Sequence, residues 1–166
     1  MKTEQAFLKH IKAHQGILIK VSKIYMDNAI DQEDLRQEII YQLWKAYPKF
    51  KGESSFTTWM YRVAVNTAIT FFKKEKKRHL FERFSDKVNV KQVEMNETID
   101  EQLAVFYKAV HQLNKIEKAL ILYTIEGYAQ KEIAQQLGLS EVNTRVKLKR
   151  TKDKIKALIK KQGYEF

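Results

Sequence analysis

The chain has 166 residues, 44% of them hydrophobic, which is enough to bury the core of one ordinary domain or of two small ones. Its formal net charge of +11 makes nucleic acid the expected partner, because positive potential raises the local concentration of polyanions. The absence of cysteine excludes disulfides, thiol nucleophiles and cysteine-based zinc sites. No apolar run reaches the roughly 20 residues of a membrane span, and the first ten residues lack the apolar stretch of a signal peptide, so we expect a cytoplasmic protein without a membrane span.

The spacing of apolar residues predicts an all-α protein, because they recur three and four positions apart and the chain has only one proline. In the first half we expect helices over residues 3–26, 31–46 and 54–78. Asp31 is placed to cap the second of these helices, and Ser54 or Ser55 the third. The second helix should end before Pro48, because the residue that precedes a proline is pushed out of the helical region.

The apolar period is lost after the third helix, which indicates a connection between two small helical domains. We expect the first domain at residues 1–80, the linker at 81–98 and the second domain at 99–166. Four further helices are expected in the second half, at residues 99–113, 115–126, 130–137 and 140–161.

The stretch EGYAQKEIAQQLGLSEVNTRVKLKRTKDKIK has the pattern of a helix-turn-helix. Ala134 is small enough to let two helices approach, Gly138 takes the turn and Ser140 caps the second helix. At about 100° per residue, one side of that helix is predicted to pack inward, with Thr144, Leu148, Thr151, Ile155 and Leu158. The opposite side carries Val142, Arg145, Val146, Lys149 and Arg150. Valines beside cations suit a DNA groove, where apolar groups meet thymine methyls and arginine bonds guanine or phosphate.

Acidic residues gather in the second predicted helix, although the protein as a whole is strongly basic. Asp31, Glu33, Asp34 and Glu38 stand there against one base, Arg36. DNA would repel such a surface, so its expected partner is a protein with a basic surface. An ordinary solvated helix face, with favourable acids in its first turn, is the alternative.

Two long segments carry a resemblance to a known family. DQEDLRQEII followed by FKGESSFTTWMYRVAVNTAITFFKK resembles region 2 of sigma-70 family factors, of the small extracytoplasmic-function (ECF) type. LNKIEKALILYTIEGYAQKEIAQQLGLSEVNTRVKLKRTKDKI is similar to region 4 of the same factors, so the resemblance covers about residues 17–161 in the family's order.

The resemblance implies a transcription initiation factor that binds RNA polymerase core through the clamp helices of the largest subunit. The first domain would recognise and melt the minus-ten promoter element, and the second would read the minus-thirty-five element. The resemblance implies no catalytic residues, no metal and no cofactor, and it implies an anti-sigma protein as a regulatory partner.

The resemblance also implies roles for particular residues. The expected core-binding residues are Asp34, Gln37 and Glu38. The loop at residues 50–56 would shape a pocket for a base flipped out of the non-template strand. The expected minus-ten contacts are Phe50, Lys51, Gly52, Ser54, Phe56, Arg62, Asn66 and Lys73, followed by phosphate-binding cations up to residue 78. The expected minus-thirty-five contacts are Val142, Asn143, Arg145, Val146, Lys149 and Arg150.

Helical geometry divides the third predicted helix into two stripes. The DNA-facing stripe is expected to hold Arg62, Asn66, Ile69 and Lys73. The core-facing stripe is expected to hold Phe56, Met60, Val63, Thr67 and Phe71. Trp59 lies at the edge of the core stripe, where packing is favoured over base contact, and Trp44 is expected in the core.

Two other classes of function compete with this interpretation. A stand-alone helix-turn-helix regulator that does not join polymerase would explain the second half but not the acidic helix or the aromatic loop. An enzyme is disfavoured because no glycine-rich phosphate loop occurs, and the spacing of His10 and His14 fits ordinary surface histidines better than a metal site.

Overall fold

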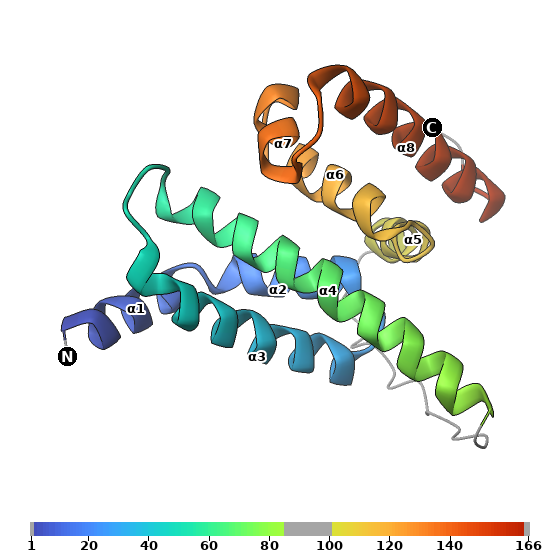
Figure 1. Cartoon of the computed structure of the whole chain (residues 1–166). Helices are drawn as coiled ribbons and strands as arrows, with labels where there is room; N and C mark the ends of the chain where they lie inside the picture. The colour runs from blue at the N-terminus through green and yellow to red at the C-terminus, as the bar shows by residue number, and fades with distance from the viewer. Residues whose placement is uncertain (1, 85–100, 165–166) are drawn as a thin grey trace. The chain divides into compact units, whose positions relative to one another are not determined.

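The protein is helical throughout the part of the chain that the computed structural model describes, residues 2–84 and 101–164. It divides into two compact units, Met1–Val93 and Glu94–Phe166, which we describe separately (Figure 1). No strand occurs in the described ranges, and the all-α class is confirmed. None of the helices in these ranges is both long and apolar enough to cross a bilayer.

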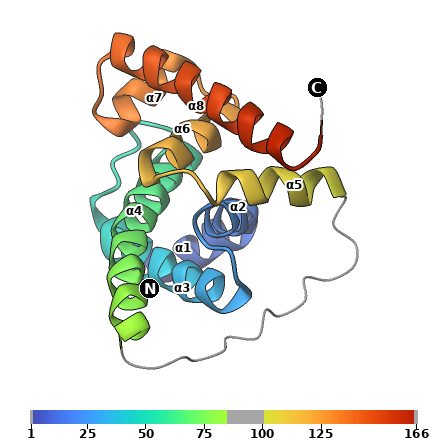
Figure 2. The same ribbon diagram turned by 90° about the vertical axis from the view of Figure 1, so that its right-hand side faces the viewer.

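The first unit is built on three helices that pack on one another. Its elements are α1 (Lys2–Ala13), α2 (Gln15–Tyr25), α3 (Ala29–Ala46), a short 3-10 helix (Tyr47–Lys49) and α4 (Phe56–Phe84). Helices α2, α3 and α4 contact one another pairwise, and Figure 2 views α2 almost along its axis with the other two beside it. Leu35, Ile39 and Leu43 of α3 are fully buried in this core. Helix α4 continues to Phe84, beyond the predicted end at residue 78, so residues 81–84 are helical and the rest of the predicted linker, up to residue 98, lies outside the described residues.

A break at His14 separates α1 from α2, so the predicted single helix over residues 3–26 is wrong. His14 has φ −121° and ψ 29°, outside the helical region. The buried face nevertheless continues across the break, with Ile11 before it and Leu18 after it. The apolar period therefore gave no sign that the helix is interrupted.

The caps of α3 and α4 differ in how well they were predicted. Asn28, not Asp31, caps α3: its Oδ1 accepts from the Asp31 backbone N–H at 2.8 Å, and its Nδ2 donates to Asp31 Oδ2 at 2.7 Å. Asp31 therefore lies in the first turn of α3, where its carboxylate accepts a hydrogen bond from the side chain of the capping residue Asn28. Of the two serines predicted as possible caps of α4, Ser55 is the one that caps it. Its Oγ accepts from the Thr58 N–H at 3.2 Å.

The buried face of α4 is rotated from the predicted one. The fully or nearly fully buried residues of this helix are Met60, Tyr61, Ala64, Val65 and Ala68. Of the predicted core stripe only Met60 is among them, because the alanines, which a search for large apolar residues passes over, face α2 and α3. Trp44 was also placed wrongly, since it is 43% exposed on α3.

The second unit contains α5 (Glu101–Val110), α6 (Lys115–Ile125), α7 (Gln130–Leu137) and α8 (Glu141–Lys161). The predicted helix-turn-helix is confirmed in α7 and α8. Gly138 has φ +67°, a left-handed conformation that side chains disfavour, and the Leu139 N–H donates to the Ala134 carbonyl at 2.9 Å to close the turn. On α8 the predicted inner residues are buried, apart from the half-buried Leu158.

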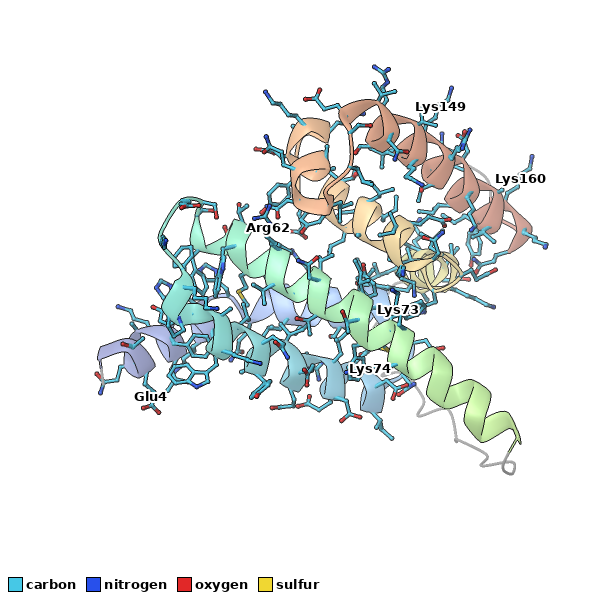
Figure 3. All side chains as sticks on the ribbon, in the orientation of Figure 1. Glu4, Arg62, Lys73, Lys74, Lys149 and Lys160 are labelled. Carbon is cyan, nitrogen blue, oxygen red and sulfur yellow. The ribbon has the colours of Figure 1, made fainter. Side chains whose placement is uncertain are left out.

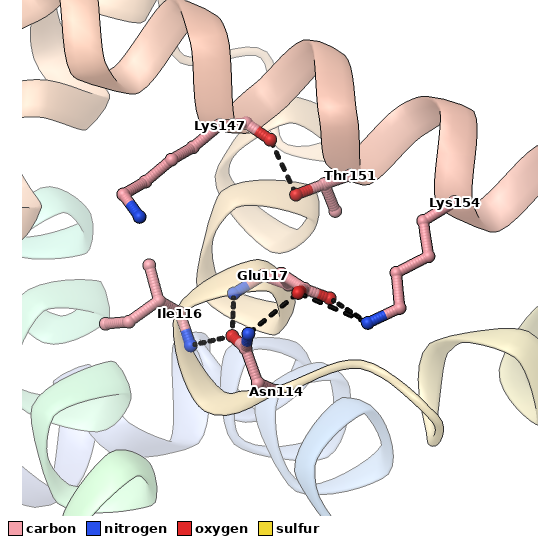
Figure 4. A network of polar contacts seen from close by, with 6 residues as sticks. All are labelled: Asn114, Ile116, Glu117, Lys147, Thr151 and Lys154. Carbon is pink, nitrogen blue, oxygen red and sulfur yellow. Dashed lines mark hydrogen bonds and ion pairs between the residues drawn. The ribbon is translucent and has the colours of Figure 1, made fainter.

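A polar network joins the start of α6 to the middle of α8 (Figure 4). The Asn114 side chain caps α6 by accepting from the N–H groups of Ile116 and Glu117 at 3.1 and 2.9 Å. The Glu117 carboxylate accepts from Asn114 Nδ2 at 2.7 Å and forms an ion pair with Lys154 Nζ at 3.1 Å. This network ties one lysine of α8 to the body of the unit.

Replacing Ser140 by alanine should lower the free energy of unfolding of the second unit by about 1 kcal/mol, the usual cost of losing an N-cap. Its Oγ accepts from the Asn143 N–H at 3.1 Å at the start of α8. Urea unfolding followed by circular dichroism measures the loss. Ser54→Ala is the matched control, because the Ser54 hydroxyl donates only to the exposed Ser55 carbonyl and caps nothing. Equal losses in the two variants would contradict the capping role.

Candidate protein-binding and DNA-binding surfaces

The predicted core-binding residues lie on the solvent side of α3, opposite the buried leucines and isoleucine of the same helix. Asp34 and Gln37 are exposed and Glu38 is half-buried. Gln37 Nε2 donates to Glu33 at 3.0 Å, and Glu38 accepts from Gln42 Nε2 at 2.9 Å. No hydrogen bond or ion pair with another described residue engages Asp34, so its carboxylate is open to a partner. We call Asp34, Gln37 and Glu38 the acidic face.

The single base of this segment is turned away from the acidic face. Arg36 forms an ion pair with Glu33, and its Nη1 donates to Ser22 Oγ on α2 at 3.2 Å. The hydrogen bond from Gln37, and then the contacts of Arg36, hold the pKa of the Glu33 carboxyl below its usual value. Asp31 is only 6% exposed, so it does not contribute to the surface. The acidic face that α3 presents to solvent is therefore negatively charged, although the protein has a net charge of +11.

A cluster of aromatic rings surrounds the loop between α3 and α4. Its members are Phe7, His10, His14, Trp44, Tyr47, Phe50, Phe56 and Trp59, which we call the aromatic cluster. Phe56 lies near its centre, with ring centroids 5.8 Å from Phe50 and 5.4 Å from Trp59. Phe50, Phe56 and Trp59 are half-buried, so each ring both packs and keeps an accessible part. Half-exposed aromatic rings are the platforms on which unpaired bases stack.

Two histidines complete the aromatic cluster and were not predicted to belong to it. The His10 ring lies 4.3 Å from the Phe56 ring with an angle of 19° between their planes, and the His14 ring lies at 5.7 Å and 29°. Their spacing of four residues on the sequence was a usable signal, because it indicates one helix face. On the sequence the pair was expected to be ordinary surface histidines rather than a metal site. No group of three or more metal-ligating side chains exists among the described residues.

The polar residues of the loop point outward while its rings pack inward. Lys51, Gly52 and Ser54 are exposed. Gly52 has φ +73°, a left-handed conformation that favours glycine over residues with a side chain. The loop therefore presents a cation and a hydroxyl beside the accessible edges of the aromatic cluster.

The predicted DNA-facing stripe of α4 is on the outside of the helix. Arg62, Asn66 and Lys73 are exposed and Ile69 is half-buried; Figure 3 labels Arg62 and Lys73. Lys74 is exposed as well, and the side chains of the cations predicted at residues 76–78 lie outside the described residues.

The six residues predicted to contact the minus-thirty-five element are all exposed on α8. Val142 is 62% exposed and Val146 40%, which places two apolar side chains in solvent between cations. Asn143, Arg145, Lys149 and Arg150 surround them. The second helix of the helix-turn-helix thus offers both apolar contacts and charged hydrogen-bond donors.

Comparison with known proteins agrees with this arrangement. The family model for sigma-70 region 2 matches residues 10–78, and the family model for sigma-70 region 4 matches residues 103–155. The two regions cover most of the chain and follow the family's order. The chain belongs to the sigma-70 family of RNA polymerase sigma factors and is of the ECF type.

Individual relatives show how far the similarity extends. RNA polymerase sigma factor SigZ of Bacillus subtilis is 26% identical over 149 residues, which cover 88% of this chain and 82% of that protein. ECF RNA polymerase sigma factor SigG of Mycobacterium tuberculosis is 46% identical over 50 residues, 30% of this chain; the match spans only 14% of that longer protein. The fold resembles that of the sigma factor RpoE of Bartonella quintana, solved with the anti-sigma factor NepR, with a TM-score of 0.73, 20% identity and coverage of 94% of this chain and 98% of that one.

Proposed function

We propose that this protein binds RNA polymerase core and directs it to a limited set of promoters. The observation that carries the proposal is the pair of surfaces of opposite charge, the acidic face on α3 and the exposed cations of α8, each within a matched sigma region. A stand-alone helix-turn-helix regulator would need only the second surface. The match of residues 10–78 to region 2 argues against that alternative.

The acidic face is the proposed contact for the clamp helices of the largest polymerase subunit. Asp34 supports this role best, because no other described residue pairs with it. Complementary charge speeds association and fixes the register of a protein interface. The opposite side of α3 is anchored in the core by the fully buried side chains of Leu35, Ile39 and Leu43. We therefore expect the acidic face to keep its geometry on binding.

The loop at residues 50–56 and the outer stripe of α4 are the proposed site for the melted minus-ten element. A base extruded from the duplex loses its stacking at a cost of a few kcal/mol, which stacking on an aromatic side chain offsets by about 1–3 kcal/mol. Phe50 and Phe56 would supply the rings, and Lys51, Gly52 and Ser54 the polar edge of the pocket. Arg62, Asn66 and Lys73 would continue the contact along the single strand.

The exposed side of α8 is the proposed reader of the minus-thirty-five element in the major groove. Arg145, Lys149 and Arg150 can bond guanine edges or phosphates, Asn143 can bond adenine, and Val142 and Val146 can contact thymine methyls. As a polymerase subunit the protein would perform no covalent chemistry of its own and would act in the cytoplasm. The complex of the similar RpoE with an anti-sigma factor supports an anti-sigma protein as a regulatory partner here.

Co-purification with core polymerase, followed by run-off transcription from a genomic fragment library with and without the protein, tests the proposal. We expect a stable complex and new transcripts whose aligned start sites share two upstream elements. DNA binding without core association would refute it in favour of the stand-alone regulator.

Replacing Arg145 and Lys149 by alanine should flatten the salt dependence of DNA binding. Each phosphate contact contributes about 0.9 to the slope of log affinity against log salt, so the slope should fall by about 1.8 if both cations lie on phosphates. Fluorescence anisotropy with a promoter duplex measures it. Lys9→Ala with Lys12→Ala, which removes the same charge from α1, should leave the slope unchanged, and an unchanged slope in the first variant would exclude this face.

A further inference from the structure

The cations of α8 continue beyond Arg150, the last residue proposed above to contact the minus-thirty-five element. One row runs the length of the helix with successive members three or four residues apart. We call this row the basic row; its members are Arg145, Lys149, Lys152, Lys156 and Lys160. At about 100° per residue they fall within one narrow arc, and at about 1.5 Å per residue the row is about 22 Å long. Figure 3 shows two of its members, Lys149 and Lys160, on the same outward side of α8.

The basic row forms no ion pair with another described residue, and Asp153 is the one acid that lies beside its middle. All five side chains are exposed, and none forms a hydrogen bond with a described residue. Lys154, on another side of α8, shows the contrast because Glu117 neutralises it. Like charges three or four residues apart on a helix repel and destabilise it. Helix stability therefore does not explain the basic row, whereas a bound polyanion would relieve the repulsion.

We propose that Lys152, Lys156 and Lys160 bind consecutive DNA phosphates beside the minus-thirty-five element and so extend the contact of α8 beyond the bases it reads. The inference rests on the proposed function of the second unit in DNA binding. The contact is independent of sequence and sensitive to salt, since only backbone charge is recognised.

The chemistry of this part of α8 selects a phosphate backbone over an acidic protein. Protein interfaces are enriched in aromatic residues and depleted in lysine. Between Arg150 and Lys160 the exposed residues are lysines, Asp153 and Ala157, with no large apolar side chain among them. The basic row also begins with Arg145 and Lys149, so its last three members continue a surface proposed above to bind DNA.

The test uses the full chain and a fluorescent 30-base-pair duplex of mixed sequence, titrated between about 50 and 200 mM salt, the range over which phosphate contacts are strongly resolved. The test variant carries Lys152→Gln, Lys156→Gln and Lys160→Gln. Glutamine is chosen because its helix propensity is close to that of lysine. The slope of log affinity against log salt should fall by about 2.7, so the affinity deficit of the variant should shrink about 40-fold across that range. The corresponding triple arginine variant should keep the original slope.

Control variants separate the possible outcomes. Glutamine at Lys9, Lys12 and Lys45 removes the same charge from exposed sites of the first unit and should not change the slope. If the triple variant of the basic row keeps its slope while the Arg145 and Lys149 variant loses slope, the extended contact is refuted and the proposed function stands. If neither variant changes the slope, DNA binding by α8 is itself refuted. If the triple variant binds DNA normally but no longer co-purifies with core polymerase, the basic row binds an acidic protein surface and the inference is wrong.

Discussion

Reversing the charges of Asp34 and Glu38 to lysine should weaken the affinity for core polymerase by about 100-fold or more. Placing like charges against each other at an interface costs several kcal/mol, and each 1.4 kcal/mol is a factor of ten in affinity. The fold should be unaffected, because Asp34 is exposed and Glu38 bonds only the Gln42 side chain among the described residues. Biolayer interferometry with immobilised core measures the affinity, and circular dichroism checks the fold.

The matched control for this variant is charge reversal at Glu4 and Asp27. Both acids are exposed in the first unit and neither belongs to the acidic face, so the net charge changes equally while core affinity should hold. Equal weakening in the two variants would mean that overall charge, and not the acidic face, governs binding. Unchanged affinity after reversal of Asp34 and Glu38 would remove α3 as the core contact.

Replacing Phe56 by alanine should impair promoter opening more than any other single change in the loop. The Phe56 ring contacts His10, His14, Phe50 and Trp59, so its loss opens the centre of the aromatic cluster. We expect a loss of about 2 kcal/mol in the free energy of unfolding, roughly half the 3–5 kcal/mol typical of a fully buried phenylalanine. Open-complex formation, followed by permanganate reactivity of unpaired thymines, should fall by more than the fraction of unfolded protein accounts for.

Phe7→Ala distinguishes the role of the ring in opening from its role in stability. Phe7 is buried and packs on Trp44 and Tyr47, at centroid distances of 5.0 and 5.3 Å, on the side of the aromatic cluster away from the loop. This variant should lose at least as much stability as Phe56→Ala and still open promoters normally at a temperature where it is folded. Equal defects in opening would show that Phe56 acts only through folding.

Sequence alone predicted the second unit better than the first because its signals are local. Gly138 at the turn and Ser140 at the cap each act within a few residues, and the end of α7 and the start of α8 follow directly from them. Apolar period was less informative in the first unit. It continues across the break at His14, and it cannot show that Ala64 and Ala68 are the residues of α4 that face α2 and α3.

The candidate sites show the same division between local and long-range information. The exposed side of α8 and the acidic face follow from helical geometry once each helix is placed. The participation of His10 and His14 in the aromatic cluster does not, because it brings together segments more than 40 residues apart in sequence. Such contacts depend on how α1 packs, which no local pattern specifies.

The aromatic cluster comes from two separate stretches of the chain, residues 7–14 and 44–59, which limits how its loop can be exchanged with other sigma factors. The rings around Phe56 come from α1 and the residue after it, from the 3-10 helix, and from the loop and first turn of α4. A chimera that receives residues 50–56 alone would carry Phe56 without the imidazoles that stack on it. Transfer of promoter preference by grafting should therefore require His10 and His14 as part of the same cassette.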